Sequence, residues 1–399
     1  MKVWIENPFD NIPPEGFRPQ RYWLMAQAFA QAGHDVVYWT SDFSHSLKAR
    51  RKLQCELFGN PFPMRLVKTE PYSRNVSVAR ARSHRRYAAK WLEDARAAAA
   101  AEGAPDVVVV SVPPLSAPGA AFRLRDEFGC KVVVDVMDAW PQTFRRLLPR
   151  QAGWLYPILF APLFRMAKRA YSKADLVTGV CDGYREMALS AGAKSYYRAY
   201  HGIDLSPPPR IERRHDGLKL VYAGGTGRTY DLETPVRALA RLEGATLAVA
   251  GAEGPAMASL RGLAASLGCA DRLLTPGYLG ADALERLLRS CDIGIVPMDV
   301  GSFVGMPYKL ADYSAAGLAV ASSLGGESAA LLSRYRAGAS YPPSDADGFV
   351  AAVREIAADL HGCRSRARAM AEAEFDAGRI YREYAEVVRR LYMGGAKLI

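Results

Sequence analysis

Three glycines between residues 224 and 227 form a loop suited to binding a phosphate. The loop follows a predicted strand at 218–223, precedes a predicted helix at 231–242 and reads Gly224-Gly225-Thr226-Gly227-Arg228. Glycine lets the backbone approach a ligand closely, and a helix N-terminus offers free N–H groups and a positive dipole end. Arg228 adds a charged donor for an anion. The pattern indicates a diphosphate site, but a purely structural strand-to-helix turn explains the glycines equally well.

A second loop leads into a short helix, predicted at 308–316, that carries a lysine and an aspartate. The loop contains Gly305-Met306-Pro307, and Pro307 suits the first turn of a helix. Lys309 and Asp312 are three residues apart and therefore share one helical face. The Asp312 carboxylate suits a ribose diol, and the Lys309 ammonium suits the adjacent phosphates. The alternative is an exposed Lys–Asp pair that contributes little to stability.

Two loops in the first half carry polar groups that could meet the other substrate. Asp138 follows a strand predicted at 131–136. The loop after the first strand contains Gly16, Arg18 and Arg21, and its arginines suit an anionic donor or acceptor. Aspartate also caps helices and forms turns, and exposed arginines are common, so each loop has a structural alternative.

The elements that position these loops alternate between strand and helix in both halves of the chain. Continuous apolar runs such as DVVVVS at 106–111 predict parallel strands that are buried on both faces. The predicted strands are 2–5, 35–40, 106–111, 131–136, 175–180, 218–223, 245–250, 292–297 and 318–322, and the predicted helices are 18–33, 79–102, 115–128, 231–242, 256–267, 281–290, 308–316, 344–359 and 376–393. This α/β order favours two Rossmann-like, doubly wound parallel sheets facing across a cleft, with ligands beyond the carboxyl ends of the strands.

The boundaries follow from composition. We predict a first domain over 1–205, a linker over 206–217 that is rich in proline and charge, and a second domain over 218–375. A C-terminal helix over 376–399 is amphipathic and is expected to pack back on the first domain.

Composition excludes several classes of protein. The chain has 399 residues, half of them apolar, which suits two α/β domains. It has no run of eighteen apolar residues and no signal-peptide pattern at its start. The six cysteines form no CxxC pair, so free thiols in a cytoplasmic protein without a metal site or cofactor are expected. No RRM, KH or zinc-finger pattern predicts nucleic-acid binding, and nothing in the sequence indicates the oligomeric state.

The net positive charge comes entirely from the first half of the chain. Residues 1–210 contain 30 Lys and Arg against 19 Asp and Glu, whereas the remainder has 22 of each. The apolar segment 154–164 lies between Arg145, Arg146 and Arg150 on one side and Arg165, Lys168 and Arg169 on the other. This composition suits an interfacial segment on an anionic membrane surface, and hence a polyprenyl-diphosphate-linked acceptor. A helix packed inside the first domain, with a merely solvated basic face, is the alternative.

The order and spacing of the motifs resemble the retaining glycosyltransferases of the GT-B fold, group 1 (family 4), in the branch that builds bacterial cell-surface polysaccharides. The resemblance covers nearly the whole chain. It rests on Gly33-His34-Asp35-Val36, Ser111-Val112-Pro113-Pro114-Leu115, Asp135-Val136-Met137-Asp138-Ala139-Trp140-Pro141, Ala174-Asp175-Leu176-Val177, His201-Gly202-Ile203-Asp204, Tyr222-Ala223-Gly224 and, most specifically, Pro307-x-Lys309-x-x-Asp312-Tyr313-x-Ala315-x-Gly317.

The resemblance implies transfer of a sugar from a UDP- or GDP-sugar to a glycan acceptor, with retention and without a metal. Residues 224–228 would then cradle the diphosphate, Asp312 would hold the ribose, and Lys309 would offset charge on the leaving group. Residues 302–306 would lie against the donor sugar. The same resemblance places Tyr278 near the base and makes Asp138 the best candidate for a polar group near the anomeric carbon.

Three positions depart from the family pattern. The first glutamate of the usual motif falls at Val304, and the usual Arg and Lys of the phosphate loop fall at Gly225 and Tyr230. Arg228 and Lys309 are the expected substitutes. The first-domain histidine common in the family has no counterpart that the sequence alone can place.

Two other functions fit the same pattern. A nucleotide-sugar 2-epimerase of this fold would bind the same donor and need no acceptor. A non-catalytic nucleotide-sugar-binding protein is the third possibility, because the first motif glutamate is absent.

Overall fold

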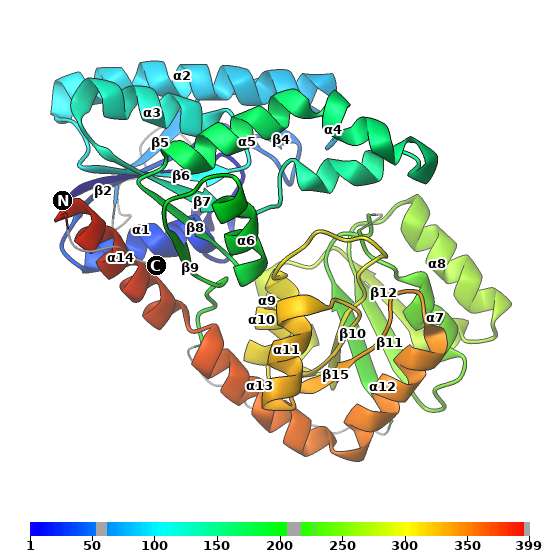
Figure 1. Cartoon of the computed structure of the whole chain (residues 1–399). Coiled ribbons are helices and arrows are strands. Elements are labelled where there is room, and N and C mark those ends of the chain that lie inside the picture. Colours follow the sequence, from blue (N-terminus) through cyan, green and yellow to red (C-terminus); the bar gives the residue numbers. More distant parts are fainter. Residues whose placement is uncertain (53–61, 206–216, 228, 395–399) are drawn as a thin grey trace. The chain divides into compact units, whose positions relative to one another are not determined.

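The computed structural model describes residues 1–52, 62–205, 217–227 and 229–394. The chain divides into two compact units; in Figure 1 unit 1 is coloured from blue to green with a red C-terminal helix, and unit 2 from green to orange. Unit 1 consists of Met1–Gly202 and Ala377–Ile399, and unit 2 is Ile203–Asp376. The expected linker, 206–217, lies outside the described residues except for Gly217.

Unit 1 is built on a seven-stranded parallel sheet in the order β5-β2-β1-β6-β7-β8-β9. Its strands are β1 (Lys2–Glu6), β2 (Asp35–Ser41), β5 (Met64–Val67), β6 (Val107–Val112), β7 (Lys131–Val136), β8 (Leu176–Gly179) and β9 (Tyr196–Arg198). Every residue of β6 is buried, as its unbroken apolar run predicts for a central parallel strand. A separate hairpin joins β3 (Phe43–Ser44) to β4 (Ala49–Arg50).

Helices cover both faces of this sheet. In Figure 1, α2 (Val78–Glu102), α3 (Ala117–Phe128) and α5 (Ala161–Lys173) cover one face, and α1 (Arg21–Gln31) and α14 (Ala377–Tyr392) lie on the other. The remaining helical segments of unit 1 are η1 (Pro13–Glu15), η2 (Gln142–Leu147), η3 (Arg150–Leu155), α4 (Tyr156–Leu159) and α6 (Asp182–Ser190).

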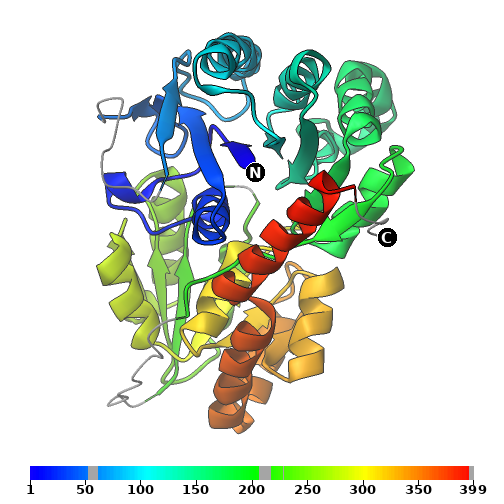
Figure 2. The same cartoon turned by 90° about the vertical axis from the view of Figure 1, so that its left-hand side faces the viewer.

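The C-terminal helix packs on unit 1. Figure 2 shows α14, in red, beside the dark blue α1. Its inward residues Tyr381, Tyr384 and Val388 are buried, so the amphipathic face indicated by the sequence is the face that packs.

Unit 2 has a six-stranded parallel sheet in the order β12-β11-β10-β13-β14-β15. The strands are β10 (Lys219–Ala223), β11 (Thr246–Ala250), β12 (Leu273–Gly277), β13 (Ile293–Val296), β14 (Ala319–Ser322) and β15 (Gly338–Ser340). The helices are α7 (Glu233–Leu239), α8 (Pro255–Ser266), α9 (Ala281–Arg289), α10 (Tyr308–Ala315), α11 (Gly326–Tyr335), α12 (Ala346–Ala358) and α13 (Leu360–Glu374), and a 3-10 turn, η4, spans Ala270–Arg272. In Figure 1, α7, α8 and α12 cover one face of this sheet, while α10, α11 and α13 cover the other.

Each sheet has one point where the strand order reverses direction. In unit 1 this switch point lies between β1 and β6, and in unit 2 it lies between β10 and β13. Parallel sheets bind ligands outside the carboxyl ends of their strands at such points. The loops after these strands are therefore where each unit is expected to hold a ligand.

Within the described part of the chain, no helix combines the length and the hydropathy that a membrane span requires.

Candidate functional site

In unit 2, the glycine loop and the Lys309 helix come together beside β10. A Cβ placed on Gly224 would lie 2.4 Å from the Nζ of Lys309, so only glycine fits at this position without displacing the lysine. The φ of Gly224 is +140°, and its N–H donates to the carbonyl of Ala250 at 2.9 Å. A Cβ added to Gly225 or Gly227 would meet no atom of the described residues within 4 Å, so this part of the loop is open in the described structure.

Lys309 is held between two aromatic rings. Its Nζ lies 4.9 Å from the ring centroid of Tyr222 and 4.5 Å from that of Tyr230, and it donates to the Tyr230 hydroxyl at 3.5 Å. Among the described residues Lys309 forms no ion pair, so the exposed Lys–Asp pair weighed as an alternative is not formed. The aromatic faces hold the ammonium in place while leaving its charge unneutralised.

The tyrosine next to Asp312 fixes α10 against the sheet. Tyr313 is buried, and its hydroxyl accepts a hydrogen bond from the backbone N–H of Ala223 at 2.9 Å. Its ring occupies the space beside Gly294 on β13, where an added Cβ would lie 2.3 Å from the ring. Asp312 is half-buried on the same helix, one turn after Lys309. The residues that belong to the most specific motif thus lie at the switch point of the sheet.

The helix that follows the glycine loop begins later and is shorter than the sequence predicts. The next helix, α7, begins only at Glu233 and has seven residues. Asp231 accepts hydrogen bonds from the backbone N–H and the hydroxyl of Thr234, at 3.1 and 2.6 Å. Asp231 thus caps the first turn of α7, and the diphosphate-binding role of the glycine loop stays a prediction. The helix that begins beside Lys309 is α10, with Pro307 as its N-cap.

The other residues predicted to bind the donor differ in how far they are exposed to solvent. Tyr278 follows β12 and its side chain is 66% exposed. The side chain of Met306 is buried against the Ser328 hydroxyl, so only its backbone could face a ligand. Gly305 and Pro307 lead into α10, Thr226 lies in the open loop, and Arg228 lies outside the described residues. The donor roles of these residues stay predictions.

On unit 1, Asp138 lies just beyond the carboxyl end of β7. Burial raises the pKa of its carboxyl to about 6, against the lowering effect of the Arg80 guanidinium. A carboxylate that titrates near neutral pH is suited to accepting a proton from a hydroxyl.

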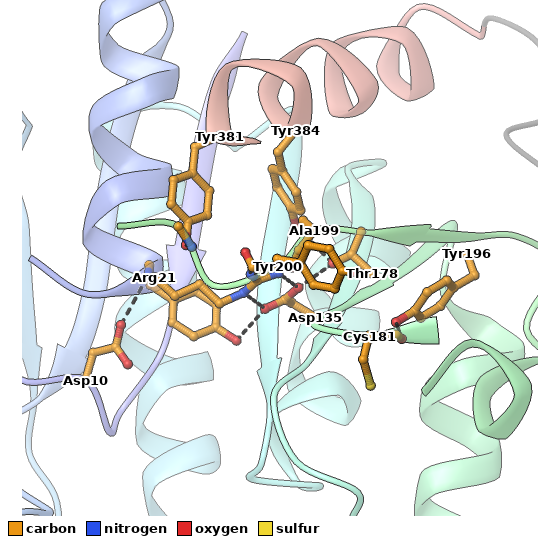
Figure 3. Close-up of polar contacts among 12 residues, drawn as sticks. Asp10, Arg21, Asp135, Thr178, Cys181, Tyr196, Ala199, Tyr200, Tyr381 and Tyr384 are labelled. Atoms are coloured by element: carbon orange, nitrogen blue, oxygen red, sulfur yellow. Dashed lines mark hydrogen bonds and ion pairs between the residues drawn. The ribbon is translucent and has the colours of Figure 1, made fainter. Parts of the chain in front are cut away.

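The prediction that Arg21 faces a ligand is wrong. Arg21 is fully buried, and its Nε and Nη2 donate to the two oxygens of Asp135, each at 2.8 Å (Figure 3). Its Nη1 donates to the carbonyls of Ala199 and Tyr200, at 2.8 and 3.1 Å. Its bonds to Asp135 and to these two carbonyls join α1 and β7 to the loop after β9.

Gly16 and Arg18 remain exposed in the loop before α1. Gly16 adopts φ +82° and ends the 3-10 turn η1, which explains the glycine structurally. Their acceptor role stays a prediction.

Two glycosyltransferase family models match the chain, one in each half. "Glycosyl transferase 4-like domain" matches residues 20–196, and "Glycosyl transferases group 1" matches residues 209–359. The chain is a GT-B glycosyltransferase. No curated protein matches it by sequence.

Solved structures of similar fold include other glycosyltransferases. Sucrose-phosphate synthase from Thermosynechococcus elongatus has a TM-score of 0.76 at 16% identity, over 99% of this chain and 100% of that one. HepE of Anabaena, in complex with UDP and glucose, has a TM-score of 0.68 at 13% identity, over 98% and 99%. WaaG, involved in lipopolysaccharide biosynthesis, has a TM-score of 0.62 at 14% identity, over 97% and 99%. At these identities the likeness concerns the fold.

The enzyme also has a cluster of cations and aromatic rings around Asp138 that the sequence did not reveal. Arg80 lies over the rings of Phe9, Tyr72 and Trp140, with its Cζ 5.2–5.9 Å from their centroids. The ring of His84 lies 5.7 Å from that of Trp140, and it is a first-domain histidine near the predicted catalytic carboxylate. Arg80 and His84 lie one turn apart on α2, but the rings of Phe9, Tyr72 and Trp140 come from separate loops, so no spacing in the sequence could have grouped the whole cluster.

Proposed function

We propose that this glycosyltransferase moves a sugar from a nucleoside-diphosphate sugar to a lipid-linked glycan acceptor, with retention, in the assembly of a cell-surface polysaccharide. The observation that carries the proposal is the placement of Lys309. Its unneutralised ammonium lies at the mouth of the open Gly224–Gly227 loop, at the switch point of the unit 2 sheet. An anionic diphosphate is the ligand that such a lysine and such a loop suit best.

In the reaction we propose, the acceptor hydroxyl oxygen forms a bond to the anomeric carbon as the bond to the diphosphate breaks. Lys309 stabilises the negative charge that develops on the departing diphosphate. The Asp138 carboxylate accepts the hydroxyl proton, and the acceptor attacks the face from which the diphosphate departs. The ribose hydroxyls are assigned to Asp312.

The test is a thermal-shift comparison of UDP-, GDP- and other nucleotide-sugars, because a donor stabilises only the state that binds it. We expect one donor class to raise the melting temperature, and that donor to be consumed only when a glycan acceptor is present. Epimerised sugar formed from donor alone would show that the enzyme is a 2-epimerase. No stabilisation by any nucleotide-sugar would contradict the proposal.

Asp138 makes the proposed reaction depend on pH. Its pKa of about 6 leaves the carboxyl ionised at pH 7–8 and protonated as the pH falls. We therefore expect the transfer rate to fall about tenfold for each unit below pH 6. The Asp138→Asn variant should be slow at every pH and lack this acidic limb, whereas Asp126→Asn, an exposed control on α3, should keep both. An unchanged acidic limb in Asp138→Asn would exclude Asp138 as the base.

The lipid part of the proposal rests on an apolar patch of unit 1, which we define as Leu147, Trp154, Ile158 and Leu159. Their side chains are 44, 69, 64 and 57% exposed. On the inner side of the same segment, Tyr156 is buried and Phe160 and Phe164 pack against its ring. The flanking Arg145, Arg146, Arg165, Lys168 and Arg169 are exposed. An apolar surface ringed by cations suits the interface of an anionic membrane.

Vesicle binding tests the apolar patch. We expect the enzyme to bind vesicles containing phosphatidylglycerol at low salt, and the triple variant Trp154→Ser, Ile158→Ser, Leu159→Ser to bind at least about tenfold more weakly because it buries less apolar area. A control with Leu274→Ser and Val300→Ser removes exposed apolar side chains from unit 2 instead. Equal binding by the triple variant and the wild type would rule out this patch as the membrane contact.

A further inference from the structure

Two cations of unit 1 lie against one aromatic ring, that of Tyr72. The Nζ of Lys48 lies 5.0 Å from the centroid of Tyr72, and the Cζ of Arg80 lies 5.9 Å from it. In the portion of the chain that the structure describes, neither side chain forms an ion pair. Both are half-buried, so water screens their mutual repulsion less than it would at an open surface.

The elements around these cations fix them in place. Lys48 is the last residue of the turn between β3 and β4, and its ammonium donates to the side-chain oxygen of Asn75 at 2.6 Å. Arg80 lies in the first turn of α2, whose N-cap is Ser77, and it donates to the carbonyl of Asn75 at 2.7 Å. Both cations therefore bind the same residue, Asn75.

The backbone at Lys48 is unusual for a lysine. Its φ is +54°, in the left-handed region that favours glycine. Side chains in this conformation carry a cost and concentrate at functional sites. Lysine at a position where glycine would be easier agrees with a role for the ammonium itself.

Two histidines complete the cluster as neutral groups. The Nε2 of His84 accepts a hydrogen bond from the Nε of Arg80 at 3.2 Å, which requires an unprotonated nitrogen. The Nδ1 of His45 lies 3.2 Å from the Lys48 ammonium and 2.6 Å from the Tyr72 hydroxyl. Burial, with the charge of Arg80 next, lowers the pKa of each imidazole to about 3. The cluster thus has a positive field, and Asp138 is the carboxylate that its Arg80 influences.

We propose that Lys48 and Arg80 bind the diphosphate of the lipid-linked acceptor, next to Asp138. A phosphate group supplies the negative charge that this cation pair lacks, and its oxygens accept hydrogen bonds from an ammonium and a guanidinium. The inference rests on the proposed function, because it names the part of the acceptor that unit 1 holds.

The cluster is joined to the apolar patch by aromatic contacts. Trp140, under Arg80, packs against Phe144 at 4.6 Å between centroids, and Phe144 stacks on Phe160 at 5.6 Å. Phe160 belongs to the segment that presents the exposed Ile158 and Leu159. A lipid-linked diphosphate suits this arrangement, with its chain toward the apolar patch and its phosphates toward Lys48 and Arg80.

The experiment uses the full chain, saturated with UDP so that the donor loop is occupied, and inorganic pyrophosphate as the probe. Binding is followed by calorimetry and by the imidazole nitrogen signals of His45 and His84 in NMR spectra at pH 5. We expect pyrophosphate to bind and to raise the pKa values of both imidazoles. In Lys48→Gly, which removes the ammonium and suits the backbone, and in Arg80→Met, binding should weaken about ten- to a hundredfold.

The control is Arg82→Met, which removes an exposed arginine from the same helix and should change nothing. Equal pyrophosphate binding by the wild type, Lys48→Gly and Arg80→Met would overturn the inference, as would its absence in the wild type. A second arm compares vesicles containing a polyprenyl diphosphate with vesicles containing phosphatidylglycerol at equal charge. The inference requires that the wild type bind the polyprenyl-diphosphate vesicles more tightly and that Lys48→Gly abolish this preference. Equal binding of the wild type to both kinds of vesicle would contradict the inference. Nucleotide-sugar stabilisation, which tests the proposed function, is measured separately in the same variants.

Discussion

Replacing Arg21 by methionine is expected to lower the free energy of unfolding of unit 1 by about 3–5 kcal/mol. Arg21 and Asp135 are both fully buried, so the substitution leaves a carboxylate without its cation in the core. Asp135 keeps hydrogen bonds from Tyr22 and Thr178, at 2.8 and 2.5 Å, but these are neutral donors. Removing one partner of a buried ion pair costs far more than the pair itself contributes.

The loss of stability in Arg21→Met is also expected to depend on pH. Burial raises the pKa of the Asp135 carboxyl, but the charge and hydrogen bonds of Arg21, together with the hydrogen bonds from Thr178 and Tyr22, hold that pKa below its ordinary value. A depressed pKa contributes stability above the unfolded pKa of about 4 and loses it as the pH falls through the folded value. Without Arg21 the pKa of Asp135 rises above its ordinary value. At acidic pH the carboxyl is then protonated, so the variant no longer carries an unpaired buried charge. The deficit of Arg21→Met should be largest near pH 7 and smaller near pH 5.

Urea denaturation at these two pH values measures the effect. The double variant Arg21→Met, Asp135→Asn should lose less than the sum of its single variants, because it removes the charge that was left unpaired. The control is Arg96→Met, which breaks the exposed Arg96–Glu127 pair and should cost about 0–1 kcal/mol. An Arg21→Met variant as stable as this control at pH 7 would show that the buried pair is not what holds α1 to the sheet.

The central strands of both sheets were predictable because burial on both faces favours a run of apolar residues. A strand buried on both faces is mostly apolar, and valine fills most positions of β6 and β7. In the two large sheets the strands that were not predicted lie at the outer positions: β5, β9, β12 and β15; the short β3 and β4 were not predicted either. They are short or carry polar residues, and β12 contains Pro276, which an edge position tolerates. Helices α6, α11 and α13 were also missed, and a single residue, Asp359, separates α13 from α12.

The candidate site was predictable where its residues are close in sequence. Lys309 and Asp312 share one helical turn, and the glycine loop is continuous. Arg21 could not be assigned in this way, since its partner Asp135 is 114 positions away and an arginine has the same sequence signal whether buried or exposed. The cluster around Arg80 was missed for the same reason: it is assembled by the tertiary fold from loops after three strands and the first turns of α2.

Tyr230 shows how the structure changes the meaning of a departure from the family pattern. The resemblance places a lysine at this position. In this chain Tyr230 instead supplies a ring and a hydroxyl to Lys309, which comes from a different segment. Lys309 thus brings a positive charge to the loop from a different segment of the chain.

Replacing Lys309 by methionine is therefore expected to lower kcat/KM for the accepted nucleotide-sugar by about 10²–10³-fold. Methionine can occupy the apolar space between Tyr222 and Tyr230, so the fold should survive while the ammonium is lost. The loss should appear mainly in kcat, because the charge on the diphosphate grows as the glycosidic bond breaks. The measurement is the rate of nucleoside-diphosphate release, with melting temperature as the check on folding.

Three further variants separate a catalytic charge from a structural contact. Arg237→Met removes an exposed cation of unit 2 from α7 and should keep full activity. Gly224→Ala keeps the ammonium but introduces a Cβ 2.4 Å from it at φ +140°, so it should displace Lys309 and lower the rate as well. If Lys309 acts through its charge, Lys309→Arg should recover part of the rate that Lys309→Met loses. Near-normal turnover in the Lys309→Met enzyme would show that Lys309 takes no part in the reaction.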